Sequence, residues 1–253
     1  MEKKKNDFIA QGSILAIASI LVRVMGMIYR IPMTAIIGDK GNGFYSYAYS
    51  VYTILLLLSS YSLPLAVSKM VSAKAQLGQW RNVKRVFICA IAFAIGIGTT
   101  FGLIVLIGAQ FFTRVFFHSE LAAIALRFMA PTILIMALLG VFRGFFQGLQ
   151  NTLPTAVSQI VEGLINAIMS VVFAYFLFDF GHGMDAAGGT TDLGYAWGAA
   201  GGAIGTGAGA LAGLIFCFIL FVAYRKILAV NISRDKTGTQ QEYGDIFRLM
   251  LSI

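Results

Sequence analysis

The sequence predicts an all-α, multi-pass membrane protein of about six transmembrane helices, with the start of a seventh at the C-terminus. Hydrophobic residues make up 58% of the 253 residues and charged residues 12%, whereas typical soluble domains carry about 25% charged residues. Apolar runs recur at the ~20-residue length that a hydrocarbon core of ~30 Å requires. We expect a six-helix transmembrane lobe over residues 1–226, followed by a cytoplasmic linker and the start of a seventh helix over residues 227–253.

The predicted elements follow one another with short polar connections. Pro32 predicts a kink in the first span, and the glycine-rich residues 38–41 predict a tight turn after it. Tyr45, Tyr49 and Tyr52 share one helix face and predict an aromatic row at a membrane interface. An interfacial helix, broken near Gly78, is expected over residues 68–85. The six spans themselves are expected over residues 8–37, 44–66, 86–112, 121–148, 155–178 and 196–224.

The first predicted span carries two arginines inside its apolar run. Arg23 and Arg30 are seven residues apart, which places them within about 20° of each other on one helix face. Ser19 and Thr34 fall near the same face. An arginine at mid-membrane costs roughly 2.5–3.5 kcal/mol, so such residues usually face a bundle interior or a water-filled cavity. We therefore interpret these four residues as a cationic stripe that receives an anionic group.

The fourth and fifth predicted spans form a hairpin that carries a second polar group. Arg143 and Glu162 lie symmetrically about its turn, roughly 10 Å from it at 1.5 Å rise per residue. One interpretation is a buried ion pair that fixes the hairpin. In the other, Arg143 contacts an anionic substrate while Glu162 exchanges a proton or binds a cation, and both can hold at different steps of a cycle. Gln147 and Asn166 add polar groups to the expected cavity.

The sixth predicted span has a glycine at every fourth position. Such rows let helix backbones approach closely, and packing holds membrane helices together. A flexible hinge for a moving bundle is the alternative, and packing is the interpretation we favour. The row consists of Gly201, Gly205, Gly209 and Gly213.

Lysines and arginines are distributed unequally between the predicted loops. Twelve basic residues lie in the predicted segments on one side of the membrane, whereas the loops on the other side hold Lys40 and Arg114. This bias predicts a cytoplasmic N-terminus under the positive-inside rule. The net charge of +8 is therefore a topology signal with affinity for membrane lipids, and nucleic acid is excluded as a partner. The twelve basic residues placed on the cytoplasmic side are Lys3, Lys4, Lys5, Lys69, Lys74, Arg81, Lys84, Arg85, Arg225, Lys226, Arg234 and Lys236.

The sequence predicts no metal site and no cofactor. Cys89 and Cys217 lie in separate apolar stretches without metal-ligand spacing, so we interpret them as small buried apolar residues. His118 and His182 fall in predicted external loops and receive no role.

Four stretches resemble a known family: RVMGMIYR, GDKGNGFYSYAYS, YSLPLAVSKMVSAKAQLG and RGFFQGLQNTLPTAVSQIVEGLINA. They are similar to the polysaccharide-transport branch of the multidrug/oligosaccharidyl-lipid/polysaccharide (MOP) flippase superfamily, and within it to the stage V sporulation B-type and MurJ-like lipid II flippases. The likeness runs from Phe8 to about Lys226.

The resemblance implies two six-helix lobes around a central V-shaped cavity and alternating access. It also implies that arginines on the first helix meet the pyrophosphate of a lipid-linked saccharide. Arg23 matches that motif directly, and Arg30 lies one residue further along than in the Gram-negative pattern. The acid that relatives carry after the first external turn has no equivalent, since residues 43–45 read Gly-Phe-Tyr.

Three functions fit the sequence. The first is a non-enzymatic flippase in a bacterial plasma membrane, which moves a lipid-linked oligosaccharide diphosphate from the inner to the outer leaflet. Arg23 and Arg30 would be its diphosphate contacts and Arg143 an auxiliary contact, because the guanidinium fork binds phosphate oxygens bidentately. The second is a MATE-type multidrug exporter coupled to H+ or Na+ through Glu162. The third is a membrane-embedded transferase or a non-transporting scaffold.

The resemblance also implies a partner for this chain. One lobe cannot enclose the implied cavity, so we expect a C-terminal lobe or a homodimer partner. The final residues, EYGDIFRLMLSI, predict the opening of a seventh span. The chain is accordingly expected to be a fragment, a truncated product or half of a dimer.

Overall fold

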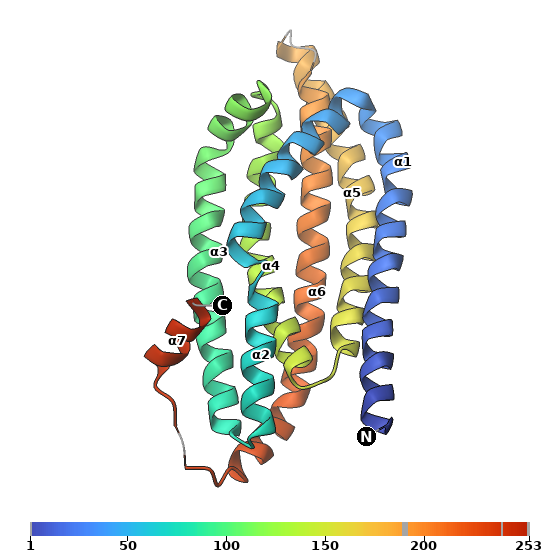
Figure 1. Ribbon diagram of the computed structural model, residues 1–253. Coiled ribbons are helices and arrows are strands. Elements are labelled where there is room, and N and C mark those ends of the chain that lie inside the picture. The colour runs from blue at the N-terminus through green and yellow to red at the C-terminus, as the bar shows by residue number, and fades with distance from the viewer. Residues whose placement is uncertain (1, 189–191, 239, 252–253) are drawn as a thin grey trace.

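The computed structural model describes residues 2–188, 192–238 and 240–251, which are entirely helical apart from short turns (Figure 1). Five helical stretches are long and apolar enough to cross a membrane: Gly12–Gln76, Trp80–Phe117, Ala122–Gly148, Leu153–Ala186 and Leu193–Ser233. This confirms the predicted all-α polytopic class. The helices are α1 (Glu2–Ser60), α2 (Leu63–Gln76), α3 (Trp80–Phe117), α4 (Ala122–Gly148), α5 (Leu153–Gly188), α6 (Leu193–Ser233) and α7 (Tyr243–Leu251).

Helix α1 folds back on itself and supplies two passes along the bundle. Its dihedral angles leave the helical region at Gly38, where φ is 63° and ψ is −177°, a conformation that glycine adopts without steric cost. Figure 1 shows the two halves running in opposite directions from this point. The predicted turn therefore lies where expected, whereas the chain continues through Pro32 as helix.

Helix α2 is not the interfacial helix predicted over residues 68–85. Its apolar face, which includes Leu63, Val67 and Val71, is buried, and it continues the second pass along the bundle to the turn at Gly78 (Figure 1). Small residues on α4 make this possible, because a Cβ at Gly144 would lie 2.6 Å from the backbone oxygen of Pro64. Residues 80–85 belong to the start of α3 instead.

Helices α5 and α6 extend past the predicted ends of their spans. The fifth span was expected to end at residue 178, whereas α5 continues to Gly188. Helix α6 begins at Leu193, and the Asp185 carboxylate accepts hydrogen bonds from the backbone N–H groups of Leu193 and Gly194 at 3.0 and 2.9 Å. Figure 1 shows this helical pair projecting beyond the rest of the bundle.

The glycine row of α6 lies against the backbone of α5. A Cβ at Gly201 would collide with the backbone of Phe173 and Ala174, and one at Gly205 with Ser170. At Gly209 it would lie 2.6 Å from the carbonyl oxygen of Glu162. The structure thus places these glycines in the closest helix contact of the bundle, as the packing interpretation requires.

Two apolar clusters occupy opposite halves of the bundle. One joins α2, α3, α4, α6 and α7, and Phe87 forms its centre with Phe145 and Phe221, whose ring centroids lie 4.9 and 4.5 Å away. The other joins both halves of α1 to α3, α4, α5 and α6. Cys89 and Cys217 are both buried in the first cluster, as predicted.

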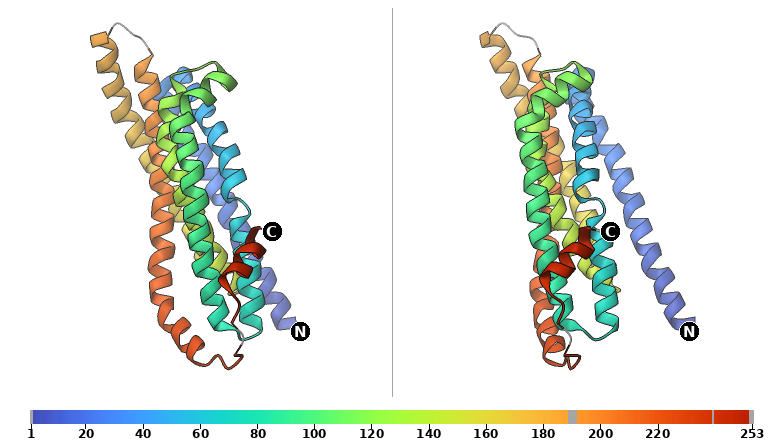
Figure 2. Two further views of the ribbon diagram at one scale, coloured as in Figure 1. Left: turned by 90° about the vertical axis from the view of Figure 1, so that its left-hand side faces the viewer. Right: turned by 60° about the vertical axis from the view of Figure 1, so that its left-hand side comes forward.

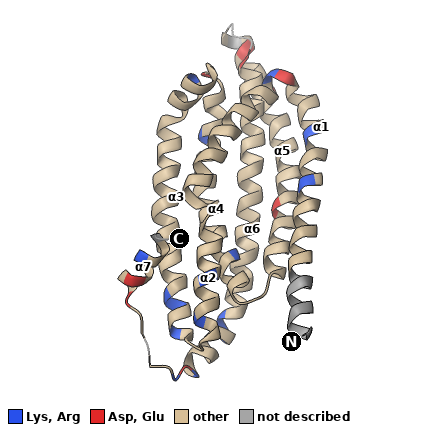
Figure 3. Ribbon diagram, in the orientation of Figure 1, with Lys and Arg blue, Asp and Glu red and all other residues tan. Residues whose placement is uncertain are grey.

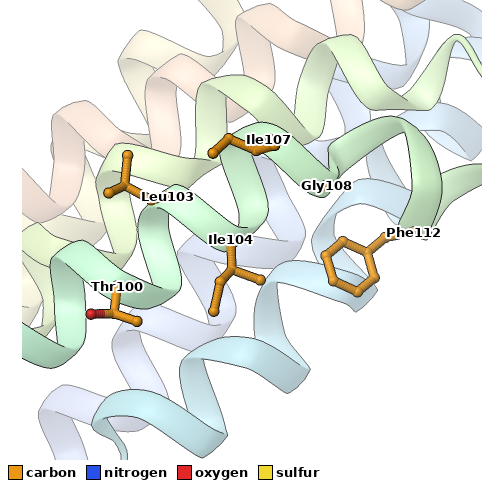
Figure 4. Close-up of a pocket in the computed structure, with 6 residues that line it drawn as sticks. All are labelled: Thr100, Leu103, Ile104, Ile107, Gly108 and Phe112. Carbon is orange, nitrogen blue, oxygen red and sulfur yellow. The ribbon is translucent and has the colours of Figure 1, made fainter.

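The outer face of α3 presents exposed apolar side chains. A shallow groove there is lined by Thr100, Leu103, Ile104, Ile107, Gly108 and Phe112 (Figure 4). Thr100 is the one residue of this lining with a polar side chain, and its hydroxyl donates to the carbonyl oxygen of Gly96 at 2.8 Å. Such a surface suits contact with lipid chains.

The segment after α6 returns to α3. The Asp235 carboxylate accepts a hydrogen bond from the backbone N–H of Arg81 at 3.0 Å, and Asn82 Oδ1 accepts one from the Gln241 N–H at 3.0 Å. Phe247 of α7 contacts Phe93 of α3 edge to face. Hydrogen bonds from the Arg81 and Thr237 N–H groups and from the Thr237 hydroxyl lower the pKa of Asp235 to about 2.

We predict that replacing Gly205 with alanine destabilises the lobe by about 1–3 kcal/mol, because the added methyl forces α5 and α6 apart. The matched control is Gly96→Ala, where a Cβ meets open space and helix propensity favours alanine by up to ~1 kcal/mol. Thermal unfolding in detergent measures both. Wild-type stability of Gly205→Ala would contradict the packing interpretation, and a Gly205→Leu protein that assembles but cannot transport would favour the hinge.

We also predict an acid-dependent weakening of the α3 contact with the segment after α6. Because the folded pKa of Asp235 is about 2 and a free aspartate titrates near ~3.9, its contribution to stability is complete above about pH 4. It is lost as the pH falls from about 4 to 2. The protection factor of the Arg81 amide, which is its exchange rate relative to an unstructured amide at the same pH, should fall over this range in the wild type. In Asp235→Asn the protection factor should already be lower at neutral pH and vary less with acid, and identical profiles would contradict the assignment.

Candidate functional site

A polar cavity of about 600 Å³ lies between the two halves of α1 and helices α4, α5 and α6. The first half of α1 diverges from the rest of the bundle toward its N-terminal end, as the right-hand view of Figure 2 shows. The polar or charged side chains that line the cavity are Arg23, Tyr29, Arg30, Tyr45, Tyr49, Tyr52, Thr53, Glu162, Asn166 and Thr206.

Arg23 and Arg30 both lie on the cavity wall contributed by the first half of α1. Both side chains are exposed. Within residues 2–188, 192–238 and 240–251, neither has an ion-pair or hydrogen-bond partner. The cavity therefore holds two positive charges that the described part of the chain does not neutralise.

Arg143 and Glu162 are in contact across the α4–α5 hairpin. Arg143 Nη2 donates to Glu162 Oε2 at 2.7 Å, and Arg143 Nε donates to Ser158 Oγ at 2.8 Å. The two charged side chains are only 12% and 24% exposed. Glu162 reaches the cavity wall, whereas Arg143 is not among the lining residues. Arg143, which lies outside the cavity lining, thus neutralises the Glu162 carboxylate, and the net charge of the lining stays positive.

Asn166 is the one predicted cavity amide that the structure places on the wall. Its Oδ1 accepts a hydrogen bond from Ser170 Oγ at 2.8 Å. On the α6 side of the cavity, the Thr206 hydroxyl is hydrogen-bonded to the Tyr45 hydroxyl at 3.2 Å.

The other predicted cavity residues lie outside the lining. Ser19 donates to the carbonyl oxygen of Leu15 at 2.9 Å and approaches Gln159 Oε1 at 3.4 Å. Gln147 donates to Thr155 Oγ1 at 3.3 Å near the α4–α5 turn, and Thr34 is half-buried on α1. None of these three residues contributes to the cavity wall.

The tyrosine row faces the cavity, where sequence reasoning expected an interfacial anchor. Tyr45 and Tyr52 are 2% and 3% exposed, and Tyr49 stacks against Tyr45 with ring centroids 5.8 Å apart. Tyr29 joins them from the first half of α1. The spacing of Tyr45, Tyr49 and Tyr52 in the sequence shows that they share one helix face. It does not show which neighbouring helix packs against that face.

These features define the class of the protein: a multi-pass helical membrane lobe with a cationic internal cavity. The described residues contain no group of three or more His, Cys, Asp or Glu side chains placed to hold a metal ion. Arg23 and Arg30, which lie beside hydroxyl and amide groups, can bind an anion through charge-assisted hydrogen bonds.

The chain belongs to the polysaccharide biosynthesis protein family, whose pattern matches residues 8–240. This confirms membership of the MOP flippases. The chain is 26% identical to stage V sporulation protein B of Bacillus subtilis (strain 168) over 240 residues, which cover 93% of this chain and 43% of that protein. Lipid II flippase MurJ of the same organism is 27% identical over 163 residues, covering 61% of this chain and 30% of that protein.

A third relative, the uncharacterized membrane protein YabM of Bacillus subtilis (strain 168), is 26% identical over 185 residues, which cover 73% of this chain and 34% of that protein. The chain thus spans less than half the length of each of these relatives.

We predict that Arg143 and Glu162 are energetically coupled. In a double-mutant cycle of Arg143→Met and Glu162→Gln, the coupling free energy should be about 1–3 kcal/mol, because the pair is mostly shielded from water. The matched control is the exposed pair Lys40 and Asp192, whose Nζ–Oδ1 distance is 2.9 Å. A cycle of Lys40→Gln and Asp192→Asn should give a clearly smaller coupling, because water screens this pair. Unfolding in detergent measures both, and equal couplings would contradict the structural role of the hairpin pair.

Proposed function

We propose that this chain forms one lobe of a flippase for lipid-linked saccharide diphosphates, which moves its substrate from the inner to the outer leaflet by alternating access. Membership of the polysaccharide biosynthesis family supports transport of this substrate class. The similarity to a lipid II flippase favours a peptidoglycan or related precursor. Transport of this kind makes and breaks no covalent bond, so the proposal requires no nucleophile.

The observation that carries the proposal is the pair of unpartnered arginines, Arg23 and Arg30, on the wall of the cavity. Cations at membrane depth are costly unless water or an anion solvates them. A diphosphate offers two negatively charged groups, and the planar guanidinium binds phosphate oxygens bidentately. The two arginines are the proposed diphosphate contacts.

Arg143 is the proposed auxiliary contact. Its guanidinium is bound to Glu162 at 2.7 Å, so a phosphate would gain access to it only when a proton or cation neutralises Glu162. In this scheme Glu162 links a coupling ion to the availability of Arg143. Asn166, which shares the cavity wall, would donate its amide N–H groups to the saccharide or the diphosphate.

The exposure of the first half of α1 supports a partner that covers the open side of the cavity. Arg23 and Arg30 are exposed, and Ala18, Met33 and Ile37 are the buried apolar residues among the described side chains of the first half of α1. We propose that a second lobe, or a second copy of this lobe, faces α1 across the cavity.

The proposed orientation places the basic end of the bundle in the cytoplasm of a bacterium. Figure 3 shows lysines and arginines gathered at the lower ends of α2, α3 and α6. Lys40 and Arg114 lie toward the opposite end, each beside a carboxylate at 2.9 and 3.6 Å. The positive-inside rule then puts the lower end, with the N-terminus, on the cytoplasmic side.

A multidrug exporter is the alternative that this charge pattern disfavours. Organic cations would enter a cavity that already holds two uncompensated positive charges, and like charges repel strongly at low dielectric.

We predict that Arg23→Gln and Arg30→Gln each reduce translocation of fluorescent lipid II by about tenfold or more, because a charge-assisted phosphate contact contributes about 1.5–3 kcal/mol. The assay follows accessibility of the lipid in proteoliposomes that contain the complete gene product. Arg127→Gln is the matched control, since Arg127 is an exposed arginine on α4 that does not line the cavity.

Wild-type translocation by the Arg23→Gln, Arg30→Gln double variant would overturn the site assignment. Export of an organic cation without any lipid translocation would overturn the function and favour the multidrug alternative.

A further inference from the structure

A second polar cavity, of about 300 Å³, lies where α3, the end of α6 and the start of α7 meet. Three basic residues from the first turns of α3 line it: Arg81, Lys84 and Arg85. The rest of its lining is formed by Ile88 of α3, Ile232 of α6, Gln240 and Tyr243. We call this second cavity the seam. It is separate from the cavity lined by Arg23 and Arg30, since the two share no lining residue. Figures 1 and 2 show α7 lying along the lower half of α3 at this place.

Arg85 joins α3 to the segment before α7. Its guanidinium donates to the carbonyl oxygen of Gln241 and to Gln240 Oε1, the latter at 2.7 Å, and it lies 5.2 Å from the centre of the Tyr243 ring. All three partners are neutral. Arg85 therefore holds the segment before α7 in place, and within the described residues it forms no ion pair.

Arg81 and Lys84 add two further positive charges, and both side chains are exposed. In the described part of the chain, neither side chain forms an ion pair. The carboxylate bonded at the seam is Asp235, whose oxygens accept hydrogen bonds from the Arg81 N–H and from Thr237. Among the residues that line the cavity, three are basic and none is acidic, so its lining is cationic.

The same face of α3 becomes apolar one turn further on. Ile88 follows Lys84 by four residues and Arg81 by seven, which places it above them on one face of the helix. Ile95 continues this line. Ile88 and Ile95 are 44% and 48% exposed. A basic group at the bundle end, followed by exposed aliphatic side chains toward the middle of the bundle, matches the headgroup and the acyl chain of a phospholipid.

We propose that this seam binds an anionic phospholipid, with its phosphate between Arg81, Lys84 and Arg85 and an acyl chain along Ile88 and Ile95. Clusters of basic residues at the cytoplasmic membrane surface attract anionic lipids, and here the cluster is shaped into a cavity. The bound lipid would bridge α3 and the segment that leads into α7, and so hold α7 against the lobe. This site is independent of the transported substrate.

The test titrates the purified protein in neutral detergent with phosphatidylglycerol or with phosphatidylcholine of the same chains, and counts bound lipids by native mass spectrometry. The Arg81→Gln, Lys84→Gln variant should bind phosphatidylglycerol about tenfold or more weakly, because it loses two phosphate contacts. Arg85 is kept in this variant, so the attachment of α7 is not broken directly. The matched control is Arg225→Gln, Lys226→Gln, two exposed basic residues of α6 that do not line the seam.

Each other outcome contradicts a stated part of the proposal. Equal losses in the two double variants would show attraction by net charge and not a built site. Competition by soluble glycerol phosphate as effective as that by the lipid would assign the seam to a free anion. A second measurement follows hydrogen exchange at residues 240–243, which phosphatidylglycerol should slow in the wild type and not in the Arg81→Gln, Lys84→Gln variant. Hydrogen exchange at residues 240–243 that does not change when phosphatidylglycerol is added would overturn the proposed role of the lipid in holding α7.

Discussion

The close backbone contact between α5 and α6 determines where the polar groups of the cavity lie. Gly209 of α6 faces the carbonyl oxygen of Glu162 and the side chain of Asn166, and a Cβ at this position would lie within 2.6 and 2.7 Å of them. Any larger residue would move α5, and with it the carboxylate that holds Arg143. The packing of small residues, which drives helix association in membranes, therefore also sets the geometry of the ion pair.

Charge balance then separates the two kinds of arginine. Arg143 is neutralised by Glu162 and held by Ser158, as a mostly shielded cation requires. Arg23 and Arg30 lie where the lobe is open, with no partner in the described part of the chain. A site with uncompensated positive charge favours an anion over a cation, and this difference underlies the proposed division between a structural pair and a binding pair.

The sequence predicted the all-α membrane class and the turn at residues 38–41. It was wrong about α2, because the polar composition of residues 68–85 suggested an interfacial helix. The glycines of α4 instead admit the apolar face of α2, with the Gly144 Cβ position 2.6 Å from the Pro64 oxygen. It also assigned the tyrosine row to an interface, although Tyr45 and Tyr52 are buried against neighbouring helices.

Composition and helical periodicity by themselves determined that the chain crosses the membrane and that Arg23 and Arg30 share one face. Both are properties of a single helix, since a seven-residue spacing fixes an angle whatever lies nearby. Tertiary structure alone decided that Asn166 lines the cavity while Ser19, Thr34 and Gln147 do not. It also decided that Glu162 reaches both the cavity and Arg143. The physical reason is that a residue's angle on its own helix does not specify which neighbouring helix packs against that face.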